Sequence, residues 1–107
     1  MQRYLLIESR DSFGRERGGF CVELARALVA RGDTTTVLLV QNGVLAARKS
    51  VRGLARLAEA GVTLLADDFS LRERGITTED LADGVHESGI DALVEAIVRE
   101  KTKAVWH

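Results

Sequence analysis

Residues 62–75, VTLLADDFSLRERG, indicate the fold class. VTLLA (62–66) is a short apolar run, which is typical of a strand buried on both faces of a parallel sheet. Two aspartates follow directly, and either can cap a helix over 67–75, because a carboxylate accepts hydrogen bonds from free backbone N–H groups. Gly75 suits the end of that helix. The stretch therefore predicts a strand–helix unit with carboxylates at the strand end.

Similar units lie on both sides of this stretch. Strand patterns occur at 4–7, 34–41, 85–87 and 103–107, and helix patterns at 20–32, 51–61 and 88–101, with an NG turn at 42–43. In the last helix, an apolar face is expected from Ile90, Leu93, Val94, Ile97 and Val98. Strands that alternate with helices predict a parallel sheet. We expect one small doubly wound α/β domain over residues 1–107, with about five mostly parallel strands and helices on both faces.

The bulk composition narrows the function classes. Fifteen basic and sixteen acidic residues give a net charge of -1, which does not favour nucleic acid as a partner and weakly favours assembly. Cys21 is the only cysteine, so no internal disulfide can form and a reducing compartment is expected. The apolar run near the N-terminus is too short for a signal peptide or a membrane span. We therefore expect a cytoplasmic protein that does not associate with membranes.

Polar side chains at the expected strand ends form the first candidate site. In a doubly wound sheet, ligands bind at the carboxyl ends of the strands. The groove expected there is lined by Asn42, Gly43, Asp67, Asp68 and His86. Paired carboxylates can hold Mg²⁺ or share a proton. A helix cap explains one aspartate without any ligand, and we favour that structural interpretation. Catalysis by a divalent metal at Asp67 and Asp68 is a third, weaker hypothesis.

The loop at 12–19 is the second candidate site. Its glycines precede a helix, where backbone N–H groups can bind phosphate, and Ser12, Arg15 and Arg17 lie within it. The spacing matches neither GxxxxGK[ST] nor GxGxxG. A connector, or an arginine-rich assembly contact, is the favoured interpretation. Binding of a nucleotide or another small molecule by the loop 12–19 and the strand-end groove is the alternative function.

Cys21 and the two histidines complete the candidates. Cys21 falls in the first turn of a helix, where the dipole can lower a thiol pKa, yet a free cysteine is usually a buried apolar residue. His86 and His107 show no close ligand spacing with Cys21 or an aspartate, so no metal site and no cofactor are predicted.

Four stretches together resemble a known family. They are LLIESRDSF (5–13), ELARALVARGDTTTVLLVQNGVLAA (23–47), GVTLLADDFSLRERGI (61–76) and SGIDALVEAIVREKTKAVW (88–106). They are similar to the DsrE/DsrF/DsrH-like proteins, which include the subunits of the bacterial Tus sulfur-relay complex. The VLLVQNGVLAA stretch and Trp106 look most like the DsrH/TusB branch.

The resemblance implies a small parallel-sheet protein that assembles into trimers or hexamers and transfers persulfide sulfur between partner proteins, toward tRNA thiolation or in sulfur oxidation. In DsrE-type subunits the sulfur-accepting cysteine follows the third strand, about eight residues before the RG glycine. Counting back from Gly75 reaches Asp67. We therefore expect a non-catalytic or accessory subunit of a homo- or hetero-oligomer, in which Cys21 alone could carry sulfur covalently.

Overall fold

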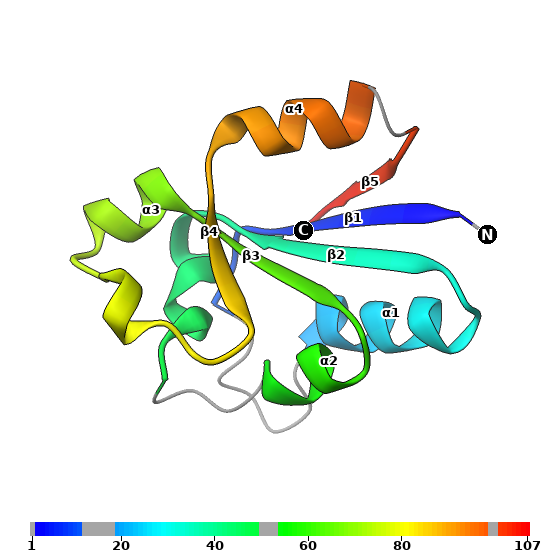
Figure 1. Cartoon of the computed structure of the whole chain (residues 1–107), viewed down its shortest axis with the longest axis horizontal. Coiled ribbons are helices and arrows are strands. Elements are labelled where there is room, and N and C mark those ends of the chain that lie inside the picture. The colour runs from blue at the N-terminus through cyan, green and yellow to red at the C-terminus, as the bar shows by residue number, and fades with distance from the viewer. Residues whose placement is uncertain (1, 12–18, 50–53, 99–100) are drawn as a thin grey trace.

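The computed structural model describes residues 2–11, 19–49, 54–98 and 101–107. Five strands and their connecting helices follow each other along the chain (Figure 1). The elements are β1 (Arg3–Glu8), α1 (Gly19–Ala30), β2 (Thr34–Leu39), the 3₁₀-helix η1 (Gln41–Ala47), α2 (Ala55–Glu59), β3 (Thr63–Asp67), α3 (Asp68–Glu73), the 3₁₀-helix η2 (Thr78–Asp80), β4 (Val85–Ser88), α4 (Ile90–Val98) and β5 (Lys103–Trp106).

All five strands are parallel and lie in the order β4-β3-β2-β1-β5. The chain moves outward from β1 to β4 and then returns to place β5 on the other side of β1. The order therefore reverses between β1 and β5. Helices α1 and α2 cover one face of the sheet, and α4 covers the other (Figure 1). The predicted doubly wound α/β fold is confirmed.

The two faces of the sheet carry cores of different size. The larger core lies on the face of α1 and α2, and Leu6, Leu39, Leu57 and Leu64 are among its fully buried members. The smaller core contains Leu5, Ile7 and Leu38, against which Leu65, Leu93 and Ala96 pack. Helix α4 thus covers the second face with only a few apolar contacts.

The apolar face expected for α4 is only partly buried. Leu93 packs on the sheet, but Ile90, Val94, Ile97 and Val98 are 42–71% exposed. The helix has the expected apolar face, but most of that face is not covered by the sheet. Helical spacing identifies an apolar stripe without showing which neighbour covers it. These four exposed residues are called the α4 stripe below.

Two connections differ from the expectation or refine it. The NG dipeptide lies inside η1 instead of forming a simple turn. A Cβ atom on Gly43 would overlap the backbone carbonyl oxygen of Glu8, so η1 can pack this closely on β1 only with glycine there. Farther along, Thr77 and Asp80 form a reciprocal capping box at η2. None of the described helices is long and apolar enough to cross a membrane.

Candidate functional site

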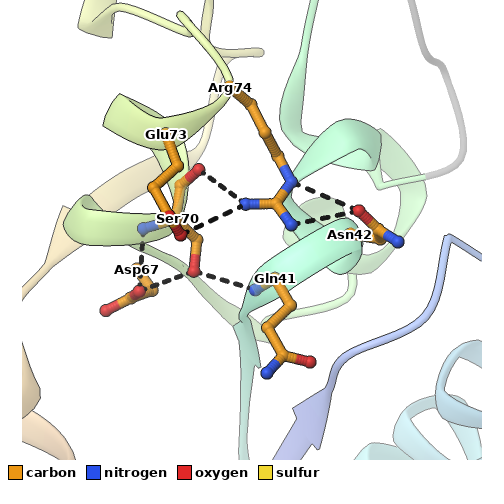
Figure 2. Close-up of polar contacts among 6 residues, drawn as sticks. All are labelled: Gln41, Asn42, Asp67, Ser70, Glu73 and Arg74. Atoms are coloured by element: carbon orange, nitrogen blue, oxygen red, sulfur yellow. Dashed lines mark hydrogen bonds and ion pairs between the residues drawn. The ribbon is translucent and has the colours of Figure 1, made fainter.

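Asp67 is the last residue of β3 and the N-cap of α3. Its Oδ2 atom accepts a hydrogen bond from the Ser70 backbone N–H at 2.9 Å and a second from the Ser70 hydroxyl at 2.7 Å. Ser70 is buried, and its Oγ atom accepts a hydrogen bond from the Gln41 N–H at 2.8 Å (Figure 2). One carboxylate oxygen therefore fixes the start of α3 and, through Ser70, the start of η1. The predicted capping role is confirmed.

Arg74 joins the same two elements a turn further on. Its Nε and Nη2 atoms donate hydrogen bonds to Asn42 Oδ1 at 3.3 and 3.1 Å, and its Nη1 atom donates to the Ser70 carbonyl at 3.2 Å. Glu73 Oε1 lies 3.8 Å from Arg74 Nη1 (Figure 2). The side chain of Asn42 is thus part of a contact that holds η1 against α3.

A cavity of about 280 Å³ lies beside Asp67, at the carboxyl ends of β2 and β3. Apolar side chains form much of its wall, namely Leu38, Val40, Phe69, Ile90, Leu93 and Trp106. Asp67 and Glu73 are the charged side chains that line it among the described residues. Two carboxylates repel an anionic phosphate, so the cavity does not favour a nucleotide.

The other predicted groove residues do not line this cavity. The Asp68 carboxylate lies 3.9 Å from Arg72 Nη1, one helical turn along α3. His86 is exposed on edge strand β4, in register with Leu65. Asn42 contacts Arg74, and Gly43 packs on Glu8. Of the five predicted groove residues, the structure brings only Asp67 to the cavity. Ser12, Arg15 and Arg17 lie outside the described residues.

Cys21 lies in a second cluster, at the carboxyl end of β1. The thiol is fully buried and hydrogen-bonded to the carboxylate of Glu8, which is itself 0% exposed. The His107 Nδ1 atom lies 3.0 Å from both oxygens of that carboxylate. Burial, and then the charge and hydrogen bond of Glu8, raise the pKa of the Cys21 thiol to about 12. The environment therefore favours the protonated thiol. It opposes the decrease in thiol pKa that a helix N-terminus alone would produce.

Neighbouring contacts hold His107 beside β1. Its backbone N–H donates to the Ile7 carbonyl at 2.8 Å, and its carbonyl accepts from the Ser9 N–H at 2.9 Å. The imidazole ring lies 4.9 Å from the ring of Phe20, centroid to centroid. Strands β1 and β5 thus bring Glu8 and His107 together, 99 positions apart in the sequence.

Glu8 was not among the predicted site residues. One signal was available, since an acid directly follows the apolar run YLLI, where the strand is buried on both faces. A buried carboxylate requires hydrogen-bonding or charged partners, so the run YLLIE implied that such partners existed. The sequence did not show which residues they are.

Comparison with known protein families matches residues 21–103 to the family described as DsrH-like protein. The chain belongs to the DsrH-like family. Membership relates this small protein to sulfur relay, in which DsrH-like proteins generally work in complexes with other proteins. No curated protein matches the chain.

Solved structures support the fold of this DsrH-like chain. A protein of unknown function from Methanobacterium thermoautotrophicum, MTH1491, is similar with a TM-score of 0.85 and 22% identity. The ychN protein from E. coli is similar with a TM-score of 0.78 and 18% identity. In both comparisons the match covers 100% of each chain. At these identities the likeness concerns the fold alone.

Proposed function

We propose that this DsrH-like chain is a non-catalytic, accessory subunit of a sulfur-relay oligomer. The observation that carries the proposal is the position of Asp67 and its role as the cap of α3. This residue, the last of β3, occupies the strand-end position where the resemblance places the sulfur-accepting cysteine of active relatives, and its carboxylate caps α3. A carboxylate has no sulfur atom, so it cannot form a persulfide. The cap gives Asp67 a structural role, which supports the proposal.

The surroundings of Cys21 support the same conclusion. Sulfur transfer to a cysteine requires an accessible thiolate, because the thiolate is the nucleophile. The Cys21 thiol is buried and donates to a carboxylate, and it lies inside the larger core with Val22 and Ala25. A partner protein would have to open this region before it could deliver sulfur there.

The exposed apolar residues support the assembly part of the proposal. The α4 stripe and Trp106 (63% exposed) lie on the side of the sheet that has the smaller core. Exposed apolar surface of this kind often marks a protein–protein contact. The cavity beside Asp67 is bounded by Phe69, Ile90 and Trp106, so a partner seated on α4 would also cover it.

Intact-protein mass spectrometry after incubation with a cysteine desulfurase and cysteine tests the proposal. The tag-free chain, its Cys21→Ser variant and a DsrE-type relative with the strand-end cysteine are treated in parallel. We expect sulfur on the relative and none on the folded chain. A gain of whole sulfur atoms on the folded chain that dithiothreitol reverses, and that Cys21→Ser lacks, would refute the accessory role.

A further inference from the structure

Three potential metal ligands meet where the strand order reverses. Glu8 ends β1, His107 follows β5, and Cys21 lies in the first turn of α1. One ligand atom from each residue lies within 4.8 Å of the other two. In an open α/β sheet, ligands bind outside the carboxyl ends of the strands at the point of reversal. Here that point lies between β1 and β5.

We propose that Glu8, Cys21 and His107 form a binding site for one divalent transition-metal ion of the Zn²⁺ type. A thiolate, an imidazole nitrogen and a carboxylate oxygen are the three ligand types that zinc takes in proteins. Mg²⁺ and Ca²⁺ prefer oxygen ligands only, so this donor set does not suit them. Three protein ligands leave a fourth position for water, as in zinc sites that are not purely structural. The proposal goes beyond the accessory role and does not depend on it.

The spacing of the ligand atoms is close to what such an ion needs. Tetrahedral zinc holds neighbouring N, O and S ligands roughly 3.3–3.6 Å apart. The distance from His107 Nδ1 to the Glu8 carboxylate oxygens is 3.0 Å, so this distance must increase by a few tenths of an ångström when the ion binds. No pair in the cluster is more than 4.8 Å apart, so the widest pair must close by at most about 1.3 Å. Side-chain rotation can supply both movements, because the three residues lie on separate segments of the chain.

Charge and access also fit a cation. The Glu8 carboxylate and the Cys21 sulfur are fully buried, and an ion with two positive charges would neutralise both the carboxylate and a Cys21 thiolate. Binding replaces the thiol proton, which passes to solvent, and no electron transfer is involved. The His107 side chain is 28% exposed, so the ion can reach the cluster from that side. The Phe20 ring lies against the imidazole and limits its movement.

Titration of the tag-free, chelator-treated protein with Co²⁺ tests the site. Co²⁺ takes the same ligands as zinc and, when bound to a thiolate, adds a near-ultraviolet charge-transfer band that hydrated Co²⁺ lacks. We expect this band to saturate at one Co²⁺ per chain and to disappear when Zn²⁺ is added. The band is expected to be absent in Cys21→Ser, and Co²⁺ affinity is expected to fall about tenfold or more in His107→Gln.

His86→Gln is the matched control, because His86 is exposed on β4 outside the cluster. Its titration is expected to equal that of the unaltered chain. Circular dichroism checks that each variant is folded, and Cys21→Ser and His107→Gln avoid altering the buried Glu8. The proposal is overturned if the unaltered chain shows no thiolate band with Co²⁺ in excess. It is also overturned if Cys21→Ser keeps the band, or if His107→Gln and His86→Gln bind Co²⁺ equally well.

Discussion

Two adjacent aspartates offer a direct test of the structural role assigned to the end of β3. Asp67→Ala removes the N-cap of α3, a change that costs about 1 kcal/mol in other helices. It also leaves the buried Ser70 hydroxyl without its acceptor, which adds about 1 kcal/mol or more. We therefore expect the free energy of unfolding to fall by about 2 kcal/mol. For a chain of this length, that corresponds to a melting temperature about 8 °C lower.

Asp68→Ala is the matched control for this prediction. Asp68 makes a partly exposed, one-turn ion pair with Arg72 at 3.9 Å, a contact worth about 0.3–0.5 kcal/mol. Urea unfolding followed by circular dichroism measures both variants under the same conditions. Equal destabilisation by the two substitutions would refute the reasoning. Asp67→Asn refines the test, because asparagine also caps helices well and should recover a large part of the loss.

Three further predictions follow from the core, the buried thiol and the exposed helix. Gly43→Ala should lower the free energy of unfolding by about 2 kcal/mol in urea, because its Cβ would overlap the Glu8 carbonyl; an unchanged midpoint would contradict this close packing. The raised pKa of Cys21 means that the unfolded chain loses the thiol proton first as pH rises above 9.0, while the folded chain keeps it up to about 12. Between pH 8 and pH 10, with a chelator present, the native chain should therefore lose about 1.4 kcal/mol more stability than Cys21→Ser, and parallel losses would exclude the shift. Replacing Val94 and Val98 with glutamate should lower the molar mass of the assembly in light scattering without lowering the melting temperature, since both side chains are exposed; an unchanged mass would mean that the α4 stripe is not the contact.

Local patterns were sufficient to predict the fold. Four of the five predicted strands contain a run of apolar or β-branched residues, and alternation with helices predicts the parallel sheet that the structure has. The cap at Asp67 was also predictable, because a capping carboxylate lies next to the helix that it caps. In both cases the residues that decide the outcome are neighbours in the sequence.

Surface positions were harder to predict for a physical reason. The α4 stripe and Leu93 have the same apolar character, and only the position of the helix on the sheet decides which of them is buried. The helix lies over a small core and leaves its outer side open. His86 shows the same limit in a strand, since edge strand β4 keeps it exposed and away from the cavity.

The cluster of Glu8, Cys21 and His107 depends on contacts that no local pattern contains. Residues 8 and 107 meet because β1 and β5 are neighbours in the sheet, and the reversal of strand order makes them so. A buried carboxylate is stable only with partners, so an acid at the end of an apolar strand implies that partners lie on adjacent elements. In this chain those partners are a thiol and an imidazole, two groups that also bind transition metals. Glu8, the buried acid that ends β1, can therefore have either of two roles. It is the acceptor in a closed hydrogen-bonded cluster, or it is one of three ligands of a metal ion, and the Co²⁺ titration distinguishes the two.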